Sequence, residues 1–338
     1  MTERKSFSSD APWESVAGYS RAVRIGKTIE VAGTTAVDSQ GQIVSPGDAG
    51  SQTKFIFKKI DKILIELDGS ENKTNLGANA TLAVSLAYAK CTAISNKQSL
   101  YKSLGKSYSL PIPLMNIING GAHADNDLNI QEFMIRPDSA ENFTDAVEKC
   151  FLVIQNLKKL LQSKKMLTNV GDEGGFAPNF SSSKEVLDEI MLSIAEAGYK
   201  PDDQISLALD AAASEFYKDG HYIIEGNKLT NTEMSDYLVD LTSSYPIISI
   251  EDGLAEDDWD GWKYLTSEIN ASIQLVGDDL FVTQEKILQK GIDEKCGNAI
   301  LIKVNQVGTI TETLDAMKLA SNNSYSSCLL YTSDAADE

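Results

Sequence analysis

Short apolar segments and amphipathic segments alternate along the chain after residue 110. The apolar segments have the length of strands, and the amphipathic segments have the spacing of helices. The apolar runs are 114–118, 133–135, 205–209, 247–250, 273–276 and 299–304, and the clearest amphipathic runs are 183–197 and 233–241. Nearly continuous apolar strands separated by helices predict a parallel α/β sheet or barrel that is covered on both faces. An open, doubly wound sheet is the competing architecture.

Polar residues at the ends of these apolar runs favour the barrel. Carboxylates, amides or a lysine follow nearly every run: Gln131-Glu132, Asp172-Glu173, Asp210, Glu251-Asp252, Asp278-Asp279 and Lys303. Barrel enzymes collect their chemistry at the carboxyl ends of many different strands. The pattern therefore predicts an active site at one end of a barrel.

The first 110 residues show a different pattern. Alternating apolar stretches at 20–25 and 29–34, joined by Gly26-Lys27, predict a hairpin, and residues 52–67 predict a helix. An Ala-rich helical region follows at 75–104, and the Pro-containing segment 110–113 introduces the strand-rich part.

Composition narrows the functional classes. The 338 residues include 30 Lys and Arg against 49 Asp and Glu, which gives a net charge of −19. A chain this acidic lacks the basic surface that nucleic acid requires, so divalent cations are the more natural partners. The first ten residues are polar and no run of about 18 apolar residues occurs, which predicts a soluble cytoplasmic protein without a membrane partner. The four cysteines are scattered and indicate reduced thiols.

Three acidic residues directly follow apolar runs, namely Asp210, Glu251 and Asp278. Their spacing suits successive βα units, so their side chains are expected to converge on one hard cation, with Mg²⁺ as the predicted cofactor. For any one of them, capping of the following helix is an equally good interpretation. The three together favour the metal site.

Three further residues are candidates for proton transfer. Lys303 ends an apolar run, where a partly desolvated ammonium beside a metal has a lowered pKa and can act as a general base; the alternative is a lysine held by neighbouring carboxylates. Glu173 lies in a Gly-flanked turn and is a candidate general acid, against the alternative of an ordinary loop residue. His123 follows a Gly-rich loop, and an isolated histidine is more often structural than catalytic.

Five segments closely resemble the enolase family: LPIPLMNIINGGAHADNDLNIQEFMIRP, VGDEGGFAPN, ISIEDGL, QLVGDDLFVT and LIKVNQVGT. The resemblance covers residues 60–322. It implies phosphopyruvate hydratase activity, the reversible Mg²⁺-dependent dehydration of 2-phosphoglycerate to phosphoenolpyruvate in glycolysis. It also assigns roles: Asp210, Glu251 and Asp278 as magnesium ligands, Lys303 as the base, Glu173 as the acid with Glu132 beside it, and His123, Gln131, Glu132 and Lys303 as substrate contacts.

The two ends of the chain depart from this family. Residues 11–60 resemble the start of a Rid-type imine deaminase, and 328–338 resemble a non-native tail, so an assembly chimera is expected. The expected layout is a Rid-like hairpin and helix at 1–62, a helical remnant of the enolase N-terminal domain at 63–110, a partial catalytic barrel at 111–325 and the tail at 326–338. The predicted fold is an incomplete enolase-type (β/α)8 barrel with seven family strands, preceded by that α+β remnant.

These departures predict impaired catalysis. The loop serine and the His-Arg-Ser stretch of the family are absent from the sequence, so a catalytically silent fragment that binds at most a metal or a surface is the alternative function. An acid-sugar dehydratase and an imine deaminase are less consistent with the motifs. The family implies a homodimer, and the reduced N-terminal domain weakens that expectation.

Overall fold

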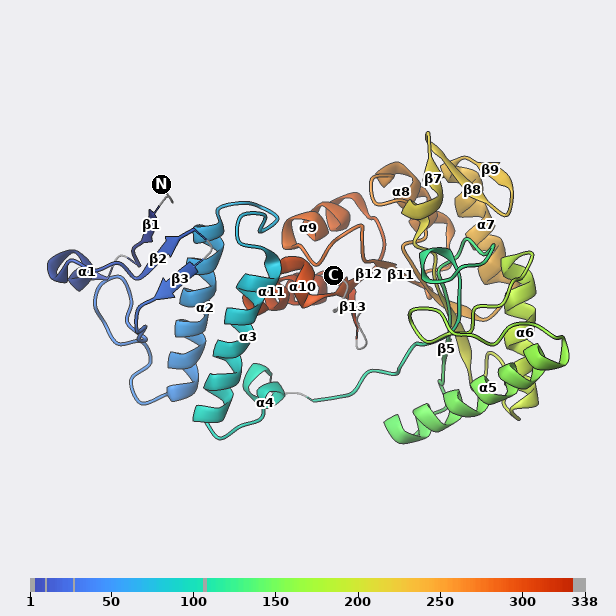
Figure 1. Cartoon of the computed structure of the whole chain (residues 1–338), viewed down its shortest axis with the longest axis horizontal. Coiled ribbons are helices and arrows are strands. Elements are labelled where there is room, and N and C mark those ends of the chain that lie inside the picture. Colours follow the sequence, from blue (N-terminus) through green and yellow to red (C-terminus); the bar gives the residue numbers. More distant parts are fainter. Residues whose placement is uncertain (1–3, 10, 27, 106–107, 331–338) are drawn as a thin grey trace. The chain divides into compact units, whose positions relative to one another are not determined.

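The computed structural model describes residues 4–9, 11–26, 28–105 and 108–330 (Figure 1). The chain divides into two compact units. The first unit consists of Met1–Ser109 and Lys303–Lys318, and the second of Leu110–Ile302 and Leu319–Glu338. Each unit therefore combines two separate stretches of the sequence.

The first unit pairs a small sheet with helices. Its strands β1 (Arg4–Phe7), β2 (Ala22–Ile25) and β3 (Thr28–Val31) form an antiparallel sheet in sequence order. Its helices are α1 (Pro12–Ala17), α2 (Ala49–Asp68), α3 (Ala78–Ser95), α4 (Leu100–Leu104), α10 (Val304–Val307) and the start of α11 (Ile310–Asn322). The β2–β3 pairing confirms the predicted hairpin, although Lys27 of its joint lies outside the described residues. Helices α2, α3 and α4 confirm the helical predictions at 52–67 and 75–104.

The apolar core of the first unit lies between the hairpin and α2. Ala22 of β2 packs against Ile63 and Leu67 of α2, and each of the three side chains is at most 4% exposed. Burial of Ile63 and Leu67 stabilises the unit by about 1.5–3 kcal/mol apiece. The hairpin therefore folds onto α2 through ordinary hydrophobic packing.

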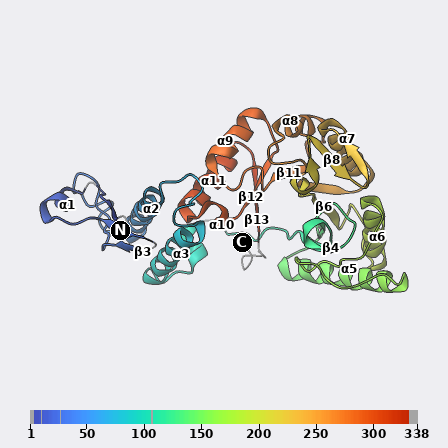
Figure 2. The same ribbon diagram turned by 45° about the horizontal axis from the view of Figure 1, so that its top comes forward.

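The second unit contains a seven-stranded sheet with the strand order β13-β12-β11-β10-β6-β5-β4. Figures 1 and 2 both label its strands β11, β12 and β13. Its strands are β4 (Met115–Asn119), β5 (Glu132–Arg136), β6 (Ser206–Asp210), β10 (Ile247–Glu251), β11 (Gln274–Gly277), β12 (Ala299–Ile302) and β13 (Ser326–Leu329). Within the described ranges the two outer strands, β4 and β13, do not pair with each other. The sheet is open, which confirms an α/β fold with an incomplete barrel of seven strands.

Strand direction differs from the prediction at one side of the sheet. The strands from β6 to β13 are parallel, as the pattern predicted, but β5 pairs antiparallel with both β4 and β6. Residues 120–131 join β4 to β5 without a crossover helix, and parallel strands need one. Two helices lie between β5 and β6 and bring the chain back to the edge where β5 ends, which also gives an antiparallel pair.

Helices and a small sheet complete the second unit. The helices are α5 (Phe143–Ser163), α6 (Ser183–Glu196), α7 (Asn231–Ser244), α8 (Trp259–Glu268) and α9 (Glu285–Glu294), and the small antiparallel sheet is β7 (Tyr217–Lys218), β8 (His221–Ile224) and β9 (Asn227–Leu229). Helix α7 begins with a capping box, in which Thr230 and Glu233 satisfy each other's backbone amides. The expected non-native tail begins within this unit: Ser326–Leu329 forms β13 beside β12, and residues 331–338 lie outside the described part.

A buried ion pair in the first unit yields a prediction about pH. Burial alone would raise the pKa of Glu14, but hydrogen bonds from Ser8, Ser9 and Arg21 outweigh it and hold the pKa at about 2, against an ordinary value of 4.5. A carboxylate with a lowered folded-state pKa contributes stability above pH 4.5, and this stability is lost as the pH falls towards 2. The shift corresponds to at most about 3 kcal/mol.

We expect Glu14→Gln to lower the free energy of unfolding of the first unit at pH 7. In the variant this free energy should also decrease much less than in the parent as the pH falls from 5 to about 2. Urea unfolding followed by hydrogen exchange of α2 amides measures both effects. The exposed Glu30 on β3 provides the matched control, Glu30→Gln. Equal acid sensitivity of the parent and the Glu14 variant would contradict the prediction.

Candidate active site at the carboxyl ends of the strands

Three predicted metal ligands lie at the carboxyl ends of neighbouring parallel strands. Asp210 is the last residue of β6, Glu251 is the last residue of β10, and the two are paired in the strand register. Asp278 directly follows β11, which pairs with β10 on its other side. Adjacent parallel strands end at one edge of a sheet, so the fold brings these three predicted residues to the same edge.

The strand register extends this arrangement into a row. Glu132, the first residue of β5, pairs with Asp210, and Asn119, the last residue of β4, pairs with Glu132. Because β5 runs antiparallel to its neighbours, its first residue lies beside their last residues. Four neighbouring strands thus contribute Asn119, Glu132, Asp210 and Glu251 to one continuous row.

Burial makes the acidic part of this row electrostatically unfavourable. Asp210 is 7% exposed, and burial followed by the charge of Glu132 raises its pKa to about 8, although Gln131 Nε2 donates to Asp210 Oδ2 at 3.0 Å. Burial and the charges of Asp210 and Asp278 raise the pKa of Glu251 well above its ordinary range. Clustered, buried carboxylate oxygens are the donor set that a hard divalent cation prefers, and bound Mg²⁺ would relieve their mutual repulsion. The residues therefore fit the predicted cofactor.

Asp252 is a site residue that sequence analysis did not single out. It is 5% exposed, and its carboxylate accepts hydrogen bonds from the backbone amides of Asp278, at 3.0 Å, and Asp279, at 2.8 Å. Asp252 thereby fixes the turn that carries Asp278. Its only signal in the sequence is the Glu251-Asp252 doublet, which does not reveal which of the two carboxylates binds the neighbouring turn.

The compact acidic groups of the described residues differ in part from the predicted ligand set. Ligand atoms of Asp252, Asp278 and Asp279 lie within 4.8 Å of one another. Asp210 and Glu251 are not members of this group. Of the three predicted ligands, Asp278 alone belongs to it, and the convergence of all three on one cation stays a prediction.

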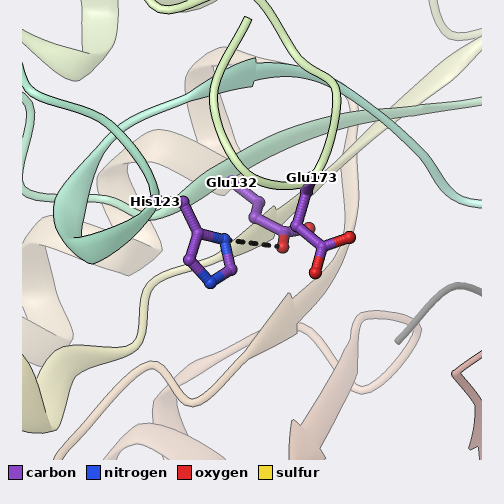
Figure 3. Close-up of side chains that lie close together, drawn as sticks. All are labelled: His123, Glu132 and Glu173. Carbon is purple, nitrogen blue, oxygen red and sulfur yellow. Dashed lines mark ion pairs between the residues drawn. The ribbon is translucent and has the colours of Figure 1, made fainter. Parts of the chain in front are cut away.

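A second cluster joins His123, Glu132 and Glu173 (Figure 3). His123 Nδ1 lies 3.3 Å from Glu132 Oε1, and the Glu173 carboxylate lies beside them. The hydrogen bond with Glu132 raises the pKa of His123 despite burial, and the charges of Glu132, Glu173 and Asp210 act in the same direction. The structure therefore assembles three predicted residues into a group that can hold and exchange a proton.

Glycines allow the Glu173 turn to approach β4 closely. A Cβ on Gly175 would lie 2.7 Å from Oδ1 of Asn119 and 2.9 Å from the backbone nitrogen of Ile118, which no real side chain tolerates. Backbone hydrogen bonds from Asn119 to Phe176 and from Phe176 to Ile117 hold the segment after the turn along β4. The Gly-rich sequence around Glu173 is thus required by packing as well as by chemistry.

Gln131 and Lys303 complete the predicted set. Gln131 directly precedes β5, and its side-chain amide donates a hydrogen bond to Asp210. Lys303 directly follows β12, whose four residues are buried, and is the N-cap residue of α10. The position after a buried strand agrees with the apolar run that was used to predict it.

Two protein-family models match the chain and show the family to which it belongs. The model of the enolase C-terminal TIM barrel domain matches residues 107–338, and that of the enolase N-terminal domain matches residues 27–104. The chain belongs to the enolase family. This confirms the resemblance of the central motifs and supports an enolase-type lyase. The N-terminal match begins inside the segment that resembles Rid-type imine deaminases, and that second resemblance stays a prediction.

Among the helices in the described part of the chain, none is both long and apolar enough to cross a bilayer.

We expect Mg²⁺ to raise the thermal unfolding temperature of the chain, because it binds the folded state and offsets repulsion among buried carboxylates. Asp210→Asn should raise the unfolding temperature in EDTA and reduce the increase that Mg²⁺ causes. At a Mg²⁺ concentration 100 times the dissociation constant the lost stabilisation is about 2.7 kcal/mol. Differential scanning fluorimetry with and without Mg²⁺ measures both effects.

The exposed Asp203 provides the matched control, since Asp203→Asn removes the same charge outside the site. An undiminished Mg²⁺ response in Asp210→Asn would contradict the assignment of Asp210 as a ligand.

Proposed function

We propose that this chain catalyses the phosphopyruvate hydratase reaction of the enolase family. This reaction is the reversible Mg²⁺-dependent dehydration of 2-phosphoglycerate to phosphoenolpyruvate in cytoplasmic glycolysis. The observation that carries the proposal is the row of buried and half-buried carboxylates, flanked by the His123–Glu132–Glu173 cluster, at one edge of an enolase-family sheet. The reaction needs both a cation site and a proton donor beside it, and the row supplies residues for each.

The cation site is proposed to consist of Asp210, Glu251 and Asp278. When bound there, Mg²⁺ supplies positive charge that stabilises the negative charge developing on the substrate carboxylate. Gln131 holds Asp210 through its side-chain amide, and Asp252 holds the turn of Asp278. The ligands are therefore oriented by hydrogen bonds before a cation arrives, which limits the reorganisation that binding requires.

The proton transfers are assigned to residues of this chain. Lys303 Nζ accepts the proton from C2 of 2-phosphoglycerate, and the Glu173 carboxyl group donates a proton to the hydroxyl on C3, which leaves as water. Glu132 lies beside Glu173 and pairs with His123, which places a second carboxylate next to the proposed donor. His123 and Gln131 are proposed to contact the substrate, which is the small-molecule partner of the site.

Turnover by this chain is proposed to be weak. The family's phosphate-binding His-Arg-Ser stretch does not occur in the sequence, whose two histidines are His123 and His221. Loss of a positioning or charge-stabilising group typically costs about 10² to 10³ in rate. A catalytically silent member that retains cation binding is therefore the second candidate, and homodimer formation is proposed by family alone.

We expect the purified chain to form phosphoenolpyruvate slowly from 2-phosphoglycerate and Mg²⁺, and Lys303→Ala and Glu173→Gln each to lower kcat by at least about 10²-fold. Absorbance of phosphoenolpyruvate measures the rate. Asp203→Asn serves as the control outside the site. Activity that survives Lys303→Ala would refute the assigned base, and inactivity of the folded parent chain would favour the silent member.

A further inference from the structure

His123 and Glu173 are carried by separate segments without regular sheet pairing. His123 lies in residues 120–131, between β4 and β5, and Glu173 lies in the turn that precedes residues 176–179. The backbone amide of Asp172 donates to the carbonyl of His123 at 3.1 Å, which is one direct contact between the segments. This contact joins the segments near Glu173, and the backbone bonds of Phe176 hold the Glu173 segment along β4.

Two asparagine side chains supply the additional contacts. Asn126 Nδ2 donates to the backbone carbonyl of Asn119, at 3.0 Å, and to that of Pro178, at 3.1 Å. Asn179 Oδ1 accepts a hydrogen bond from the backbone amide of Asp127, at 2.9 Å. The two side chains thus cross between the segments in both directions, and each bonds to the backbone of the other segment.

We propose that Asn126 and Asn179 form an amide clamp that positions the His123 segment against the Glu173 segment. They are positioning residues, because neither belongs to the cluster itself. The clamp adds positioning residues to the proposed function. It rests on that function only for the catalytic roles of His123 and Glu173. Its geometric claim, that these two asparagines keep the cluster assembled, stands on the contacts alone.

The chemistry of the clamp requires an amide at position 126. Both backbone groups that face Asn126 Nδ2 are carbonyl oxygens, so a side chain must donate two hydrogen bonds there. Asn126 Oδ1 at the same time accepts from the backbone amide of Leu128, at 3.2 Å, which fixes the orientation of the amide. A carboxylate of the same shape would repel both carbonyls, and alanine would bond to neither.

The two histidines of the chain give a direct readout. Proton NMR resolves the ring signal of His123 from that of His221, which lies in β8 of the small sheet and serves as an internal reference. In the parent chain the carboxylates around His123 raise its pKa. We expect Asn126→Ala and Asn179→Ala each to lower the pKa of His123 towards its ordinary value.

Asn156→Ala is the matched control, because Asn156 Nδ2 donates to the Leu152 carbonyl within α5 and touches neither segment. Circular dichroism at each pH establishes that every variant is folded. Asn179 is exposed, so its variant decides the test if Asn126→Ala does not fold. A folded Asn179→Ala or Asn126→Ala chain in which His123 titrates as in the parent overturns the clamp. Since the readout needs no turnover, an inactive parent chain would refute the proposed function without affecting this result.

Discussion

The strand register at the carboxyl edge of the sheet is the constraint on which the site depends. It places Asn119, Glu132, Asp210 and Glu251 side by side on four neighbouring strands. Side chains alternate between the two faces of a strand, so a slip of one residue would turn Asp210 away from both neighbours. The buried apolar residues of β6 and β10 resist such a slip, because it would exchange core and site positions along the whole strand. Hydrophobic packing therefore determines where the charges lie.

The same register forces like charges together in a buried place. The raised pKa values of Asp210 and Glu251 show that ionisation of either residue is opposed by burial and by the other carboxylates. Hydrogen bonds from Gln131 and from the backbone amide of Ala212 to Asp210 offset only part of this opposition. Such strain at a site is typical of functional rather than structural carboxylates, since a fold selected for stability alone would not retain it.

Sequence patterns predicted the features that depend on local order. The apolar runs predicted the strands. The polar residues that follow these runs were predicted as site residues, namely Asp210, Glu251, Asp278 and Lys303. The direction of β5 was missed, because it follows from the connections on either side and not from the composition of the strand. Asp252, Asn126 and Asn179 were missed for a related reason. Asn126 bonds to Pro178, which lies 52 residues away, and no local pattern distinguishes that asparagine from an ordinary loop residue.

The segment after Lys303 packs with helices of the N-terminal part of the chain. Residues 303–318 belong to the first unit, where α10 packs with α3 and the backbone amide of Ile310, the first residue of α11, donates to the Ser85 hydroxyl of α3. Asp61 of α2 accepts a hydrogen bond from the backbone amide of Thr311 at 3.2 Å, and Lys73 pairs with Glu312 at 2.8 Å. Helix α2 spans the expected junction between Rid-like and enolase-like sequence, yet its Asp61 holds a helix that lies 250 residues later. The residue proposed as the base therefore begins a segment whose backbone is anchored by α2.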